Sequence, residues 1–118
     1  MTISDVLIPF RLLQTITMTG AKNPIFIVGP CVIENMELLD TVAAELVRIN
    51  TELGVEIIFK ASFDKANRTS LSSFRGPGIE KGLEMLSAIK SRYGLRILTD
   101  IHEAWQASPV GEVVDVIQ

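Results

Sequence analysis

The sequence is poor in the residue types that define several classes of protein. Its 118 residues include one cysteine, one histidine, one tryptophan and one tyrosine. Cys31 alone cannot form an intrachain disulfide, so nothing indicates a disulfide-stabilised secreted domain. His102 is the only histidine, which excludes a metal site with several histidine ligands within this chain. No apolar run approaches the roughly 20 residues that span a bilayer, and residues 1–23 lack the features of a signal peptide.

Positive charge is also scarce overall. The chain has 11 lysines and arginines against 14 acidic residues, a net charge of -3 and a pI near 5.1. Nucleic acids require a broad basic surface, so we expect no nucleic-acid partner, and no membrane partner is indicated. With 47% hydrophobic and 21% charged residues, the composition is that of a soluble globular protein. We expect a cytoplasmic enzyme or binding domain.

Short apolar segments recur along the chain in an order typical of parallel sheets. Residues 25–28, 55–59, 95–98 and 113–117 are rich in β-branched side chains and read as strands buried on both faces. Helical patterns separate them, which predicts β-α-β-α-β-α-β order and an α/β fold with parallel strands. Periodicity alone leaves open whether the sheet is doubly wound or part of a barrel.

The helical patterns have recognisable ends. Asn35 is the expected N-cap and Gly54 the expected C-cap of the first helix, and Gly94 ends the second. A shorter helix is expected between Glu103 and Pro109. The predicted apolar faces consist of Leu39, Val42, Leu46, Ile49 and Leu53 in the first helix and Ile79, Leu83, Leu86, Ile89 and Tyr93 in the second; Met36 and Trp105 are interpreted as packing residues.

Polar residues follow each predicted strand at its C-terminal end, the end at which α/β sheets and barrels bind ligands. They are Cys31, Lys60, Asp100, His102 and Gln118. The last predicted strand lies at the end of the chain with no helix to cover it. Because complete domains rarely leave such an edge open, we expect the sequence to be part of a larger protein.

Basic residues cluster in FKASFDKANRTS, residues 59–70, which holds Lys60, Lys65 and Arg68. In an acidic chain such a cluster indicates a small anionic ligand, because lysine and arginine bind phosphates and carboxylates. The alternative is a solvated loop in which Lys65 merely pairs with Asp64. Lys60 favours the ligand, because a lysine ending a buried strand needs a partner or a ligand.

The other motifs are ambiguous from spacing alone. In TDIHE, residues 99–103, Asp100 and His102 point the same way and suit proton transfer or metal binding; alternatively Asp100 caps the next turn. SFRGPG, residues 73–78, reads mainly as a turn, in which Arg75 faces the ligand or pairs across a subunit boundary. Cys31 is either a small buried hydrophobe or a metal-binding thiolate.

Together, GPCVIE, FKASFDKANRTS, SFRGPG, TDIHE and DVIQ resemble the 3-deoxy-D-manno-octulosonate 8-phosphate synthases, also called 2-dehydro-3-deoxyphosphooctonate aldolases. The resemblance covers residues 24–118. It implies the N-terminal part of a (β/α)8 TIM barrel with about four parallel strands, preceded by an extension, residues 1–23, that forms a hairpin. It further implies a homotetrameric transferase that condenses phosphoenolpyruvate with D-arabinose 5-phosphate and releases phosphate, in lipopolysaccharide biosynthesis.

The resemblance also assigns roles. It implies that Lys60 and Lys65 lie beside phosphoenolpyruvate and the reacting carbons, and that Asp100 and His102 complete the catalytic set. The residues implied to bind substrates are Lys60, Ser62, Lys65, Asn67, Arg68, Thr69, Asp100 and Gln118. Cys31 implies the metal-dependent class, in which it ligates a divalent metal ion with partners beyond Gln118. Because a full barrel takes about 250 residues, we expect little or no activity from this chain alone.

Two other readings remain open. The sister enzyme, 3-deoxy-D-arabino-heptulosonate 7-phosphate synthase, uses erythrose 4-phosphate, but its basic loop typically reads Lys-Pro-Arg-Thr-Ser whereas this chain has KANRTS. The second is a non-catalytic fragment that acts only as an interaction module through the open edges of its sheet.

Overall fold

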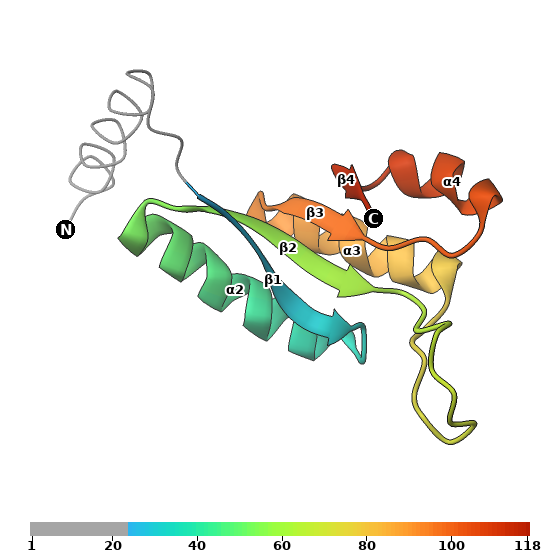
Figure 1. The fold of residues 1–118 in the computed structure, drawn as a ribbon. Coiled ribbons are helices and arrows are strands. Elements are labelled where there is room, and N and C mark those ends of the chain that lie inside the picture. Colours follow the sequence, from blue (N-terminus) through green and yellow to red (C-terminus); the bar gives the residue numbers. More distant parts are fainter. Residues whose placement is uncertain (1–23) are drawn as a thin grey trace.

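The computed structural model describes residues 24–118, so the predicted hairpin in residues 1–23 lies outside the described residues. Strands and helices alternate along the chain (Figure 1). The elements are β1 (Ile25–Val32), α2 (Met36–Leu53), β2 (Glu56–Ser62), α3 (Ile79–Tyr93), β3 (Arg96–Thr99), the 3-10 helix η1 (Ala104–Gln106), α4 (Ala107–Gly111) and β4 (Val116–Ile117). The predicted alternation is confirmed.

The four strands form one parallel sheet in the order β1-β2-β3-β4. The long helices α2 and α3 pack side by side on one face of this sheet (Figure 1). Parallel strands in sequence order, each followed by a helix, are the arrangement of a (β/α)8 barrel. The described residues therefore have an α/β fold consistent with the N-terminal part of such a barrel.

The helix ends follow from local chemistry. Asn35 accepts a hydrogen bond from the Leu38 N–H at 2.8 Å and so caps α2. Gly54 and Gly94 adopt left-handed conformations, with φ of 62° and 65°, and end α2 and α3 as predicted. Leu53 departs from the prediction, because it is 65% exposed at the end of α2. No helix within residues 24–118 is long and apolar enough to cross a membrane.

The core lies between the sheet and the two long helices. Its fully buried side chains come from β2, β3, the helices and the segments that follow the strands: Ile33, Leu39, Phe59, Phe63, Leu86, Ile89, Ile97 and Val110. Met36 packs against this core, as predicted. Trp105 does not, because it is 59% exposed and its indole N–H donates to Glu103 Oε2 at 2.7 Å.

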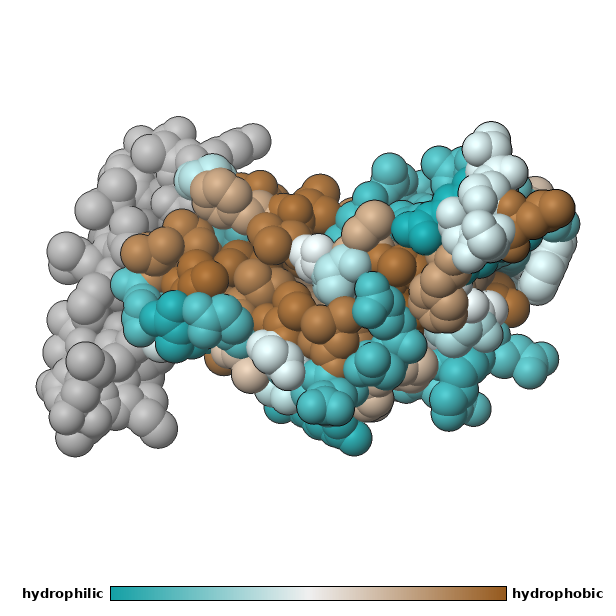
Figure 2. Space-filling model, turned by 90° about the horizontal axis from the view of Figure 1, so that it is seen from below, coloured by the Kyte–Doolittle hydropathy of each residue, from teal (hydrophilic) through white to brown (hydrophobic). Residues whose placement is uncertain are grey.

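β1 differs most from expectation. It was expected to be buried on both faces, but Ile25, Phe26, Ile27 and Val28 are between 39% and 55% exposed. The reason is its position at the edge of the sheet, where only β2 pairs with it among the described residues. Hydrophobic residues also form a broad band across one face of the molecule (Figure 2).

An ion pair and a hydrogen bond join the two long helices. The Arg92 guanidinium lies 2.9 and 3.0 Å from the two Asp40 oxygens, and the Tyr93 hydroxyl donates to the same carboxylate at 2.9 Å. The hydrogen bond from Arg92 lowers the pKa of Asp40. Desolvation opposes this effect, and the hydrogen bond from Tyr93 and the charge of Arg92 add to it, so the pKa is lowered overall. These contacts fix α2 against α3 and so help to orient the strands that carry the candidate site.

Candidate active site

A β-bulge in β1 sets the position of Cys31. The pairing of β1 with β2 shifts between Val28 and Cys31, where Gly29 approaches the backbone of Lys60. A Cβ atom at Gly29 would lie 1.7 Å from the Lys60 carbonyl oxygen, so only glycine fits. Beyond the bulge Cys31 lies opposite Ala61 in the register and is exposed. The buried alternative for Cys31 is therefore wrong.

Lys60 and Gln118 meet although 58 residues separate them in sequence. Lys60 Nζ donates to Gln118 Oε1 at 2.6 Å, from the C-terminal parts of β2 and of the β4 segment. The Gln118 backbone is held by its N–H, which donates to Thr99 O at 3.0 Å, and by its carbonyl, which accepts from Ile101 N. The predicted partner that Lys60 needs is thus supplied across the sheet.

Asp115 anchors the segment that carries Gln118. Its carboxylate accepts from Ile97 N–H at 2.8 Å and from Lys90 Nζ at 3.0 Å. Desolvation acts to raise the pKa of Asp115, but the Ile97 hydrogen bond and the Lys90 cation outweigh it, so the pKa is lowered. The carboxylate therefore stays ionised and ties β4 to β3 and α3.

Lys65 turns back toward the strand from which its loop departs. Its Nζ lies 2.8 Å from the hydroxyl of Ser62, which is fully buried at the end of β2. The predicted alternative, a pair between Lys65 and Asp64, does not form, because Asp64 binds Arg75 through two contacts of 3.0 Å. Two ammonium groups, those of Lys60 and Lys65, are thereby carried by β2 and the residues directly after it.

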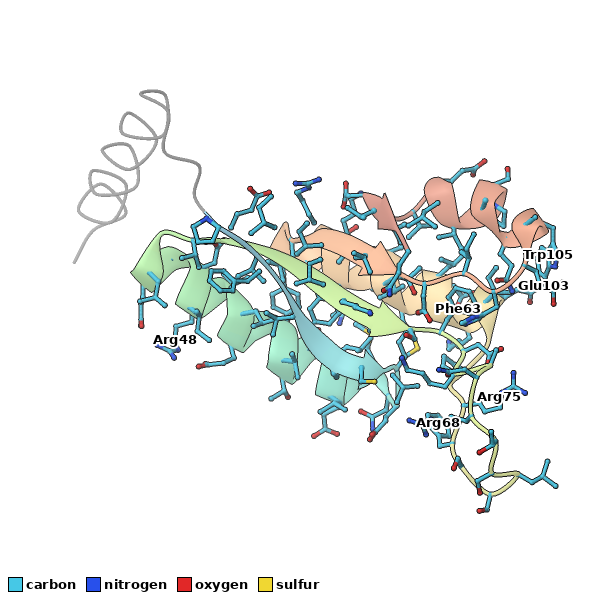
Figure 3. The ribbon with its side chains drawn as sticks, viewed as in Figure 1. Arg48, Phe63, Arg68, Arg75, Glu103 and Trp105 are labelled. Carbon is cyan, nitrogen blue, oxygen red and sulfur yellow. The ribbon has the colours of Figure 1, made fainter. Side chains whose placement is uncertain are left out.

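The rest of the basic loop extends away from the sheet. Asn67, Arg68 and Thr69 are exposed, and Arg68 donates to Phe74 O at 2.5 Å. Figure 3 shows Arg68 and Arg75 near the neck of the protruding loop, with Phe63 at its base. Within residues 24–118 the side chains of Asn67 and Thr69 form no hydrogen bond, so these two predicted residues are not brought into contact with the others.

Asp100 and His102 come together as their spacing predicted. His102 Nε2 lies 3.5 Å from Asp100 Oδ2 and 2.7 Å from the Asp64 carbonyl oxygen. The other carboxylate oxygen, Asp100 Oδ1, is buried and has no hydrogen-bond partner among residues 24–118. Because an unpaired buried acceptor costs about 1–3 kcal/mol, this oxygen is suited to receive a donor from a ligand.

Two residues that organise the site were not predicted. Asp64 joins Arg75 and His102, and the buried Gln106 accepts from the backbone N–H groups of His102 and Glu103 at 2.8 and 3.3 Å. Glu103 and Gln106 form a capping box at η1. Their three-residue spacing was a usable signal for Gln106, whereas no local pattern points to the partners of Asp64.

Cys31 is the residue to which the resemblance assigns metal binding, and its exposure leaves the thiol accessible. Within residues 24–118 no group of three or more cysteine, histidine or acidic residues could hold a metal ion. Among the described residues, Cys31 thus fits the role of a single thiolate ligand at the C-terminal edge of the sheet.

The chain is an α/β protein whose site lies at the C-terminal ends of its parallel strands. This site holds two lysines, a buried serine and an unpaired buried carboxylate oxygen. The chain belongs to the DAHP synthetase I family, whose model matches residues 8–118.

Curated relatives give a finer comparison. A 2-dehydro-3-deoxyphosphooctonate aldolase of Fusobacterium nucleatum is 50% identical over 103 residues, which are 87% of this chain and 37% of that protein. Proteins of the same name from Campylobacter jejuni subsp. doylei and Helicobacter pylori are 56% and 53% identical, over 82% and 85% of this chain and 36% of each relative. The chain thus spans a little over a third of the length of these relatives.

Proposed function

We propose that the whole protein condenses phosphoenolpyruvate with D-arabinose 5-phosphate and water to give 3-deoxy-D-manno-octulosonate 8-phosphate and phosphate. The observation that carries this proposal is the gathering of Lys60, Lys65, Ser62 and the unpaired Asp100 oxygen at one edge of a parallel sheet. The names of relatives at 50–56% identity support the eight-carbon product over the heptulosonate alternative.

The lysines supply the charge that both substrates require. Phosphoenolpyruvate carries a carboxylate and a phosphate, and the ammonium groups of Lys60 and Lys65 suit these anions. Lys60 is held by Gln118 and Lys65 by Ser62, so both cations are oriented before a ligand arrives. Such preorganised charge lowers the barrier when negative charge develops during the reaction.

The basic loop, residues 59–70, and the carboxylate of Asp100 suit the pentose phosphate. We assign its phosphate to Arg68, with Asn67 and Thr69 as further donors, because arginine can donate two parallel hydrogen bonds to a phosphate. Asp100 Oδ1 would accept a hydrogen bond from a sugar hydroxyl, which removes the cost of leaving this buried oxygen unpaired. The aldehyde would then face phosphoenolpyruvate at the edge of the sheet.

The chemistry that this arrangement serves is an aldol-type addition. Carbon 3 of phosphoenolpyruvate attacks the aldehyde carbon, water adds at carbon 2, and the carbon–oxygen bond to phosphate breaks to give the keto product. Lys60 and Lys65 would stabilise negative charge on the reacting groups and hold them close. Cys31 would contribute one thiolate to a divalent metal ion, which when bound supplies Lewis acidity.

The location, the assembly and the use of the product in the cell form the last part of the proposal. We infer a cytoplasmic, homotetrameric enzyme whose product enters lipopolysaccharide synthesis, as the resemblance of its motifs to the 3-deoxy-D-manno-octulosonate 8-phosphate synthases implies. Size-exclusion chromatography with light scattering on the full natural chain tests the assembly. A monomeric mass would contradict it.

Product analysis tests the proposed reaction. The full natural chain that contains this sequence is incubated with phosphoenolpyruvate and arabinose 5-phosphate, and the sugar product is identified by mass spectrometry. We expect an eight-carbon 2-keto sugar acid phosphate with equimolar phosphate. No condensation product would refute the proposal.

A further inference from the structure

The loop between β2 and α3, residues 63–78, is closed at its base by backbone contacts. Lys65 N donates to Arg75 O at 2.7 Å, and Gly78 N donates to Phe63 O at 3.0 Å. A Cβ atom at Gly76 would lie 2.4 Å from the Phe63 carbonyl oxygen, so the two sides of the loop approach as closely as glycine allows. The basic residues therefore leave the sheet from a fixed base.

Asp64 is held from two directions at this base. Its carboxylate receives Nε and Nη2 of Arg75, each at 3.0 Å, a bidentate arrangement that fixes the direction of both side chains. Its backbone carbonyl oxygen lies 2.7 Å from His102 Nε2. Arg75 comes from the returning side of the loop and His102 from the segment after β3, so Asp64 connects three parts of the site.

His102 is itself fixed by its neighbours. Its ring packs edge-to-face on Phe63, with centroids 6.2 Å apart and an angle of 67°. Its backbone N–H donates to Oε1 of the buried Gln106 at 2.8 Å. A carbonyl oxygen only accepts hydrogen bonds, so the contact with Asp64 places a proton on Nε2. That proton is directed at the loop backbone, and the Asp100 oxygen lies further from the same nitrogen, at 3.5 Å.

We propose that His102 and Arg75 are positioning residues. Together they hold Asp64, and through Asp64 they set the direction of Lys65 and of the phosphate-binding residues 67–69. This inference rests on the proposed function, in which the loop binds the pentose phosphate. It assigns His102 a role in holding the loop rather than in transferring protons, and it assigns Arg75 to the loop rather than to a ligand or a subunit boundary.

Steady-state kinetics of the full natural chain separate the two roles of His102. His102→Ala removes the donor, whereas His102→Gln keeps an N–H that can reach the Asp64 carbonyl. We expect His102→Ala and Arg75→Ala to raise KM for arabinose 5-phosphate roughly fivefold or more, with less than a roughly twofold effect on KM for phosphoenolpyruvate. His102→Gln should restore values near those of the wild type. Equal losses of kcat of roughly 100-fold in both His102 variants would indicate proton transfer and overturn the proposal.

The matched control is Glu56→Gln. It breaks the ion pair between Glu56 and Arg96, whose atoms are 2.7 Å apart at the start of β2 and β3, away from the loop. Its KM values should equal those of the wild type. An equal rise in the control would mean that any lost ion pair has this effect, and would overturn the specific role of Arg75.

Hydrogen exchange provides a readout that needs no activity. The peptide containing Lys65, whose amide bonds Arg75 O, should exchange roughly tenfold faster in Arg75→Ala and His102→Ala than in the wild type or His102→Gln. Unchanged exchange in all variants would overturn the positioning role. If exchange is faster in Arg75→Ala and His102→Ala but the wild-type protein does not condense the two substrates, the positioning role is supported and the proposed function is refuted.

Discussion

Arg68 stands on the exposed part of the basic loop, where it donates to Phe74 O. If it binds the phosphate of the pentose, Arg68→Ala removes a charge-assisted hydrogen bond of about 1.5–3 kcal/mol. We expect KM for arabinose 5-phosphate to rise roughly 10- to 100-fold, and KM for phosphoenolpyruvate to change by less than about threefold. Initial rates of the full natural chain, with each substrate varied in turn, measure both constants.

Arg48→Ala is the matched control for Arg68. Arg48 is also an exposed arginine; it lies on α2 and pairs with Glu45 and Glu52 on its own helix (Figure 3). Its loss should leave both Michaelis constants unchanged. If Arg68→Ala raised both constants equally, the assignment of Arg68 to the pentose phosphate would be wrong.

Cys31 is exposed beyond the bulge of β1, where a thiolate is free to bind a metal ion. Cys31→Ala removes that ligand while adding no bulk. We expect the purified full natural chain to retain a divalent metal and the variant to lose it, measured by elemental analysis after dialysis. Undiminished metal in the variant would refute the metal-dependent assignment.

The sequence predicted which polar residues lie at the C-terminal edge of the sheet better than it predicted their hydrogen-bond partners. Lys60, Asp100 and Gln118 could be placed at one edge because parallel strands bring their C-terminal ends together. The partner of Asp64 could not be predicted, because the choice between the adjacent Lys65 and the distant Arg75 depends on how the loop returns to the sheet. The prediction that Trp105 packs in the core is wrong for a similar reason, because its apolar character alone does not show which side of η1 faces the core.

Among the elements, α3 approaches Phe63, the residue directly after β2, through a glycine. A Cβ atom at Gly82 would lie 2.3 Å from Phe63 Cβ, which is not the end of a flexible side chain, so the backbone would have to shift. We expect Gly82→Ala to lower the free energy of unfolding by about 1–2 kcal/mol, although alanine favours helix formation. Urea denaturation of the full natural chain measures the change.

The control for this prediction is Ser87→Ala, at an exposed position of the same helix. It should be neutral or slightly stabilising, because only helix propensity changes. A Gly82→Ala variant as stable as Ser87→Ala would show that Phe63 does not limit the approach of α3.

The contact between α2 and α3 predicts a dependence of stability on pH. Because Arg92 and Tyr93 lower the pKa of Asp40, the carboxylate stabilises the folded state above its unfolded pKa of about 3.9. This stabilisation is lost as the pH falls through the lower folded pKa. We expect Asp40→Asn to be less stable than the wild type at pH 7 and the difference to shrink below about pH 4.

Unfolding curves at several pH values test this dependence. Glu112→Gln is the control, since Glu112 is exposed and forms no ion pair within residues 24–118. A difference between wild type and Asp40→Asn that stays constant down to pH 2 would contradict the role of Asp40.

Element order and helix ends could be predicted because they depend on local chemistry. Asn35, Gly54 and Gly94 act at the ends of their own helices, and the alternation of strands and helices fixed the parallel order. The exposure of β1 could not be predicted, because its apolar run is the same whether the strand lies inside a sheet or at its edge. Leu53 matches the apolar spacing of α2, but it is exposed because it is the last residue of the helix.

At the scale of the whole molecule, the described sheet has β1 and β4 at its two edges. Further strands of a closed barrel would pair with both edges and cover the exposed residues of β1. The relatives are much longer than this chain, which covers 36–37% of their length. Activity therefore has to be measured on the full natural chain that contains this sequence.

The most direct measurement is the initial rate of phosphate release from phosphoenolpyruvate in the presence of arabinose 5-phosphate or erythrose 4-phosphate. We predict that kcat/KM for the pentose phosphate exceeds that for the tetrose phosphate by roughly tenfold or more, because we propose that Asp100, Asn67 and Arg68 bind the longer sugar. Equal values, or a preference for erythrose 4-phosphate, would contradict the proposed substrate and favour the heptulosonate synthase.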